Sequence, residues 1–146
     1  MKRKSIKTIF FLFITLTVVA AIAGYLLWNK PHTDVRETKG IETNAIALYK
    51  SFVTDSVTAK TTFVNKVLKI TGIIKSVSEN QQHQQVILLK TSEPEASVNC
   101  TMESKAIAVS VGDKVSLKGI CIGYIGGAAD MGLPGDVFLV RCYPSI

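Results

Sequence analysis

The residues of this chain best suited to chemistry are three cysteines, Cys100, Cys121 and Cys142. Each alternates with apolar residues two positions away, so all three are expected on the inward face of a β-strand. A Cys121–Cys142 bridge would close a loop of about twenty residues and stabilise the fold by roughly 3 kcal/mol. The alternative is three buried thiols that fill the core as small apolar side chains. The spacing leaves open which cysteines pair.

Other reactive groups are sparse. The chain has two histidines, His32 and His83, and neither has further ligands at metal-binding spacing. It has no G-x-S-x-G sequence, no phosphate-binding glycine loop and no C-x-x-C pair. We therefore predict no catalytic residue, no metal and no cofactor, and expect a protein that is not an enzyme.

A loop rich in glycine, residues 124–135, is the best candidate for a binding surface. It carries Tyr124, Ile125, Met131 and Leu133, which are unusually apolar for a loop. Exposed apolar groups of this kind mark interaction sites. The alternative is that these side chains fold back and cover the core.

Hydrophobic spacing predicts the elements that position these residues. Apolar residues recur every three or four positions from Ile41 to Phe52, which predicts a helix, and Asp55 or Ser56 can begin a second short helix. From Lys66 the period changes to two. Five strands are expected at 66–75, 85–91, 96–103, 115–123 and 136–143, with a helix-prone segment at 104–108. Five strands with a helix after the third match the OB-fold, a small closed barrel. In such a barrel the last strand pairs with the third and the fourth, so Cys142 could face either neighbour.

The N-terminal region predicts a membrane anchor. Residues 9–28 are uncharged and mostly apolar, and four Lys or Arg residues precede them. Twenty residues span about 30 Å as a helix, the thickness of a bilayer core, and the cations favour a cytoplasmic N-terminus. The run is longer than a typical signal-peptide core, which favours an anchor over cleavage after Ala23. The predicted parts are a cytoplasmic stub (1–8), a transmembrane helix (9–28), a juxtamembrane linker (29–40) and an exported domain (41–146).

Charge argues against a dedicated nucleic-acid binder. The net charge of +6 is concentrated in the stub, which leaves thirteen cations against eleven acids in the exported part. Strands 85–91 and 96–103 contain no aromatic residue on which a base could stack.

Several motifs, taken in their order, resemble the tRNA_anti-like family, a family of OB-fold lipoproteins of the bacterial envelope. They are Asn29-Lys30-Pro31-His32, Leu48-Tyr49 with Phe52, Val67-x-x-Ile70-Thr71-Gly72, Gly112-Asp113-x-Val115, Gly119-x-Cys121-x-Gly123 and Cys142. The resemblance spans roughly residues 29–143 and implies an OB-fold without defined binding residues. Unlike a lipoprotein, this chain has no cysteine near the end of its apolar run.

The expectation is thus a mainly β protein: a five-stranded OB-fold barrel with an N-terminal helical segment, preceded by one transmembrane helix. It would be a single-pass protein of the bacterial inner membrane, with its barrel in the periplasm. Its function would be to bind an envelope protein, a peptide or a glycan. The alternatives are a single-stranded nucleic-acid-binding protein and a thiol-based redox or metal sensor.

Overall fold

The computed structural model describes residues 13–25, 34–103, 106–127 and 133–145, and the chain forms two compact units, Met1–Thr33 and Asp34–Ile146. In the first unit, residues 13–25 are helical with exposed side chains. Among the described residues, no helix has the length and apolar character needed to cross a bilayer. The predicted stub, and residues 9–12 and 26–28 of the predicted span, lie outside the described residues.

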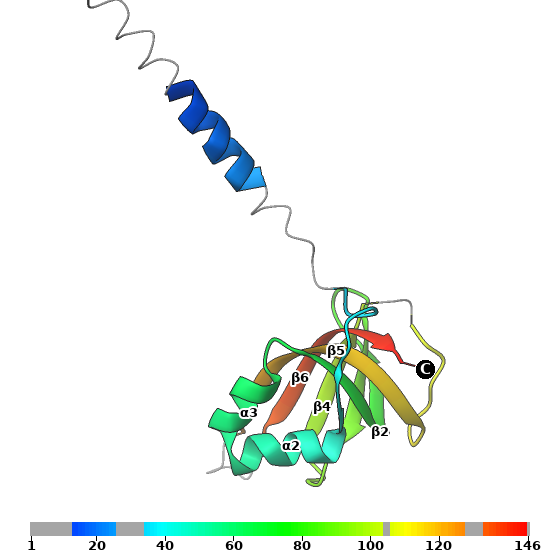
Figure 1. The fold of residues 1–146 in the computed structure, drawn as a ribbon. Helices are drawn as coiled ribbons and strands as arrows, with labels where there is room; N and C mark the ends of the chain where they lie inside the picture. The colour runs from blue at the N-terminus through cyan, green and yellow to red at the C-terminus, as the bar shows by residue number, and fades with distance from the viewer. Residues whose placement is uncertain (1–12, 26–33, 104–105, 128–132, 146) are drawn as a thin grey trace, which may run out of the picture. The chain divides into compact units, whose positions relative to one another are not determined.

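The second unit is a closed β-barrel with two helices in its described part (Figure 1). Its elements are β1 (Ile41–Asn44), α2 (Ala45–Thr54), α3 (Ser56–Phe63), β2 (Val67–Glu79), β3 (Gln85–Lys90), β4 (Ser97–Met102), β5 (Lys114–Ile125) and β6 (Asp136–Pro144). The sheet order is β1-β2-β3-β4-β6-β5, and β2 also pairs with β5, which closes the barrel. The last strand pairs with β4 and β5, as the OB-fold requires. The predicted five-stranded barrel is confirmed.

The long strand β2 bends and pairs with two neighbouring strands. Its first half, Val67–Ile73, pairs with β5, and its second half pairs with β3 after a register shift between Ile74 and Ser76. Gly72 lies just before β2 changes partner, and it also lets α2 approach the strand. A Cβ on Gly72 would lie 3.1 Å from the Cβ of Ala45.

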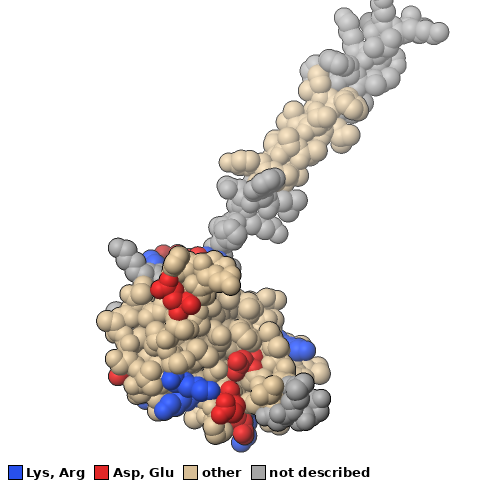
Figure 2. Space-filling view, turned by 180° about the vertical axis from the view of Figure 1, so that it is seen from behind, with Lys and Arg blue, Asp and Glu red and all other residues tan. Residues whose placement is uncertain are grey.

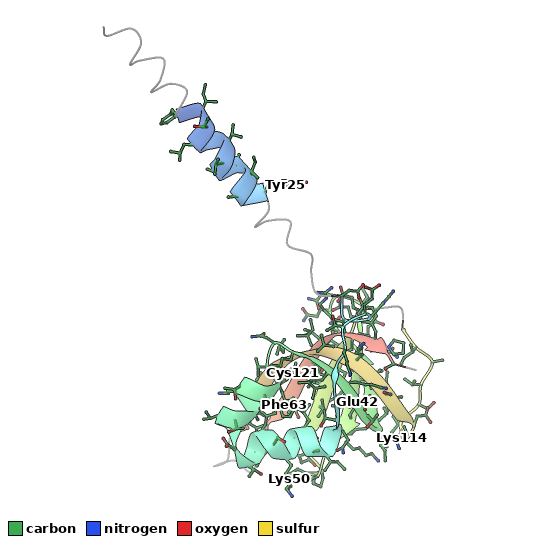
Figure 3. The ribbon with its side chains drawn as sticks, viewed as in Figure 1. Tyr25, Glu42, Lys50, Phe63, Lys114 and Cys121 are labelled. Atoms are coloured by element: carbon green, nitrogen blue, oxygen red, sulfur yellow. The ribbon has the colours of Figure 1, made fainter. Side chains whose placement is uncertain are left out.

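The helix α2 covers one end of the barrel (Figure 1) and contacts β2, β3, β4 and β6. Its buried face consists of Ala45, Leu48, Tyr49 and Phe52, at the helical spacing that the sequence predicts. Burying a Leu or Phe side chain contributes about 1.5–3 kcal/mol. Lys50 projects from the opposite, exposed side of the helix (Figure 3).

The sequence predicted that this helix begins at Ile41, which is too early in the chain. Residues Ile41–Asn44 form β1, because β2 offers them a parallel partner in which Ile41 pairs with Leu68. The helix begins only after Asn44, whose Oδ1 accepts a hydrogen bond from the Ala47 N–H at 2.8 Å. Asp55 begins α3 in the same way, as predicted, by accepting from Val57 and Thr58.

The predicted helix at 104–108 is absent from its described part, since residues 106–110 have no regular structure. The reason is that the backbone of Ile107 is paired with a side chain. Its N–H donates to Gln85 Oε1 at 2.8 Å, and its carbonyl accepts from Gln85 Nε2 at 3.0 Å. Ile107 and Val109 pack against the core instead of forming helical turns.

The domain begins earlier than residue 41. Val35 is fully buried, and the Arg36 guanidinium lies 4.4 Å from the centre of the Tyr143 ring. Lys118 Nζ donates to the Arg36 carbonyl at 3.0 Å. Residues 34–40, part of the predicted linker, therefore belong to the barrel unit.

Candidate binding cleft

A cleft of about 620 Å³ lies where α2, the β3–β4 turn and the two ends of the β5–β6 connection meet. The lining side chains include Tyr49 and Val53 from α2, Glu93 and Glu95 from the turn, Tyr124 from the end of β5 and Leu133 from the connection. We call this the loop cleft. Its volume falls within the range of small-molecule pockets.

An aromatic cluster fixes one wall of the loop cleft. The Tyr124 ring stacks on Phe52 with a centroid distance of 5.8 Å and meets Tyr49 edge-on at 6.2 Å. Phe52 also contacts Phe63 of α3 at 6.2 Å. Aromatic pairs of this geometry contribute about 0.5–1.5 kcal/mol each beyond the area that they bury. The wall is therefore held by two consecutive helices, α2 and α3, and by the distant strand β5.

The opposite lip of the loop cleft is acidic. The turn that carries Glu93 and Glu95 is held through Thr91, whose Oγ1 donates to the Glu93 carbonyl at 3.0 Å and accepts from the Glu93 N–H at 3.3 Å. These bonds use the backbone of Glu93 and leave its carboxylate free. Both carboxylate side chains are exposed, and neither forms an ion pair with a described residue.

The electrostatics of the loop cleft act on Tyr49. Burial raises the pKa of this phenol, and its proximity to Tyr124 and to the carboxylates of Glu93 and Asp136 raises it further. Tyr49 therefore stays neutral at physiological pH. Asp136 also fixes the end of the connection, because its Oδ1 accepts from the Ser97 N–H at 2.7 Å and from Ser97 Oγ at 2.9 Å.

The structure brings together part of the predicted loop surface. Tyr124 and Leu133 line the cleft, and Leu133 is 56% exposed. Tyr124 is half-buried against the core, so it both lines the cleft and covers the core, which were the two predicted alternatives. Ile125 is 65% exposed and does not line the cleft. Met131 lies outside the described residues.

The contributions of α2 and of the acidic turn to the loop cleft are not evident from the sequence. The spacing of Tyr49 marks it as a core residue, and the sequence around Pro94 marks a turn, but neither pattern shows that the two meet. The sequence feature that could have indicated this surface is a hairpin turn with two acidic residues beside a proline.

The three cysteines are buried, free thiols. In the sheet, Leu139 of β6 stands opposite Cys100 on one side and Cys121 on the other, so Cys142 lies beyond both positions. The structure has no bond between Cys121 and Cys142, which was one of the two possibilities that the sequence left open. Cys142 instead hydrogen-bonds to Cys100, which together with burial holds the pKa of the Cys100 thiol well above its usual value. Burial raises the pKa of the thiol of Cys121, which is labelled in Figure 3, to about 11.

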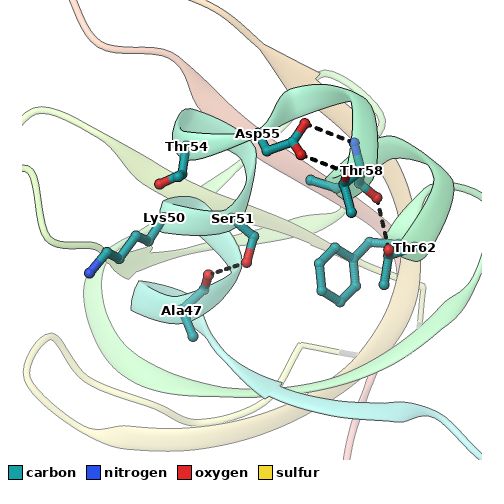
Figure 4. Close-up of a pocket in the computed structure, with 9 residues that line it drawn as sticks. Ala47, Lys50, Ser51, Thr54, Asp55, Thr58 and Thr62 are labelled. Carbon is teal, nitrogen blue, oxygen red and sulfur yellow. Dashed lines mark hydrogen bonds between the residues drawn. The ribbon is translucent and has the colours of Figure 1, made fainter.

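A second hollow, of about 580 Å³, lies between α2 and α3 (Figure 4). Several of its polar groups are already engaged within the helices. Ser51 Oγ donates to the Ala47 carbonyl, Thr58 Oγ1 to Asp55 Oδ2 and Thr62 Oγ1 to the Thr58 carbonyl. The hydrogen bonds from Thr58 hold the pKa of Asp55 below its usual value. These groups serve the helix ends, so we place the candidate site at the loop cleft.

Metal-ligating residues do not cluster within the part of the chain that the structure describes, where no three His, Cys, Asp or Glu side chains converge. His83 pairs with Glu79 at the β2–β3 hairpin.

A closed barrel with this strand order defines an OB-fold protein, and a cleft at its loop end is typical of the binding modules of this class. The sequence profile of the tRNA_anti-like family matches residues 1–131, and the chain belongs to that family. The family resemblance drawn from the motifs is confirmed. No curated protein matches the chain.

A solved structure also resembles the fold: a crystal structure described as an aspartyl-tRNA synthetase from Leishmania major Friedlin. It shares 8% sequence identity with this chain at a TM-score of 0.37, over 85% of this chain and 25% of the synthetase chain. The protein thus spans about a quarter of the length of that chain.

Proposed function

We propose that the protein is a membrane-anchored, non-catalytic binding module of the bacterial envelope that holds its partner in the loop cleft. The observation that carries this proposal is the composition of the cleft: an ordered aromatic wall, exposed apolar side chains and two unpaired carboxylates. Val53 and Leu133 are each 56% exposed at its rim. Exposed apolar side chains gathered beside an ordered aromatic wall are a candidate interaction surface.

The localisation part of the proposal rests on the N-terminal sequence. The apolar run 9–28 and the preceding cations favour a single span with the barrel in the periplasm. Such an anchor would confine the loop cleft to the neighbourhood of the membrane surface and raise its effective concentration toward envelope partners.

Nucleic-acid binding is less well supported. The loop cleft carries carboxylates, which repel phosphates. On the face seen in Figure 2, small groups of acidic and basic side chains are separated by uncharged surface instead of forming a basic groove. A thiol sensor is also less well supported, because buried thiols with raised pKa values hold little of the reactive thiolate.

The proposal is tested by crosslinking the full-length protein in cells and recovering its adducts. Val53→Glu places a charge on the rim of the loop cleft, whereas Val57→Glu places the same charge at a 72% exposed position of α3 outside the cleft. We expect Val53→Glu to lose a partner that the wild type and Val57→Glu both retain. Equal recovery of every adduct from the two variants would reject the loop cleft as the binding site.

A further inference from the structure

We infer that the occupant of the loop cleft is a peptide segment in which a Lys or Arg residue flanks an apolar side chain. This inference deepens the proposed function and rests on it, since it names the chemistry of the partner that the same cleft would hold.

The charged side chains that line the loop cleft favour a cationic ligand. Among the described residues that line the loop cleft, Glu93 and Glu95 are the charged side chains, and both are negative. The ion pairs of the described residues join Lys69 to Glu42 and Arg141 to Glu103, and His83 contacts Glu79, all away from the cleft. The two carboxylates are therefore uncompensated and favour a cationic ligand.

The apolar surface of the loop cleft favours a ligand that also carries an apolar side chain. Val53 and Leu133 are more than half exposed, and the half-buried Tyr124 ring is fixed by its stacking on Phe52. An apolar side chain placed between them would bury these surfaces without reordering the wall. A tyrosine ring beside carboxylates is also a favourable place for a guanidinium or an ammonium group.

Together these features select a basic, apolar peptide over other envelope ligands. Phosphate-bearing ligands, including nucleic acids and anionic lipid headgroups, would meet two like charges at the entrance. A neutral glycan would use the aromatic surface but would gain little from the acidic lip. A peptide that carries both a cation and an apolar side chain satisfies both halves of the loop cleft.

The test uses the full-length protein in detergent and two fluorescein-labelled probes, a blocked peptide of sequence Gly-Lys-Phe-Leu-Lys-Gly and its counterpart with Glu in place of both Lys. Fluorescence anisotropy should show at least threefold tighter binding of the Lys peptide at low salt. This preference should shrink as ionic strength rises. Glu93→Gln with Glu95→Gln should remove most of the preference, and Glu37→Gln, an exposed acid outside the cleft, should leave it unchanged.

The charge-reversed variant Glu93→Lys with Glu95→Lys gives the decisive comparison, because it should bind the Glu peptide more tightly than the Lys peptide. Equal binding of both peptides, or an unchanged preference in the charge-reversed variant, would overturn the inference. If Val53→Glu nevertheless abolished that binding, the loop cleft would survive as the site and only its charge selectivity would fail. Binding of neither peptide would overturn the inference, while the crosslinking comparison in cells would still decide the proposed function.

Discussion

The contact between Gly119 and Cys142 gives a quantitative prediction about how β5 and β6 pack. A Cβ added to Gly119 would lie 2.5 Å from Cys142 Sγ and 3.2 Å from the Val140 carbonyl oxygen. Favourable carbon contacts begin near 3.5 Å, so the added methyl overlaps the sulfur by about 1 Å. Cys142 is fully buried and cannot move into solvent. Overpacking of this kind costs about 1–3 kcal/mol, so Gly119→Ala should lower the free energy of unfolding by that amount.

The mechanism is tested by a double-mutant cycle, measured by urea denaturation followed by far-ultraviolet circular dichroism. Cys142→Ala removes the sulfur, so Gly119→Ala should cost much less in that background, with a coupling energy of about 1–3 kcal/mol. Gly126→Ala is the matched control, since its Cβ would meet its nearest atom at an ordinary 3.7 Å. Additive effects of Gly119→Ala and Cys142→Ala would refute the proposed clash.

Three further predictions concern the core and the helix ends. Asn44→Ala removes the N-cap of α2 and should lower the free energy of unfolding by about 0.5–2 kcal/mol, measured by thermal denaturation; an unchanged midpoint would contradict this cap. Phe52→Ala removes a fully buried ring that joins α2 to Tyr124 and Phe63 and should cost about 3–5 kcal/mol in the same assay, and a cost near that of an exposed alanine substitution would contradict this packing. Because the folded-state pKa of Cys121 is raised from 9.0 to about 11, its contribution to stability is fully present below pH 9 and is lost as pH rises toward 11. Cys121→Ala should flatten this part of the stability profile, and an identical slope in both proteins would count against the burial of this thiol.

The spacing of residue types along the sequence correctly predicted the parts of the fold that depend on residues close together in the chain. Alternating apolar residues located the five strands, and the inward position of Cys100 followed from the same period. Asp55 was one of the two residues predicted to cap α3, because the bonds of such a cap reach only two or three residues along the chain.

Features that depend on pairing between distant residues were missed. Ile41 continues the helical spacing of α2, yet it forms a strand because Leu68 offers it a backbone partner. The helix expected near Ile107 is replaced by the Gln85 side-chain clamp, which joins residues 22 positions apart. Likewise, the acidic lip of the loop cleft comes from a turn whose nearness to Tyr49 and Tyr124 arises only when the barrel closes.

The most direct test of the central claim is site-specific photo-crosslinking in cells from position 133. A photoreactive residue replacing Leu133 would lie on the rim of the loop cleft, and the same residue replacing Val111, which is 64% exposed in the loop before β5, serves as the control. The proposed function predicts a discrete adduct from position 133 that is absent from position 111 and is lost when Val53→Glu is added. No adduct from position 133, or the same adduct from both positions, would contradict the assignment of the loop cleft as the binding site.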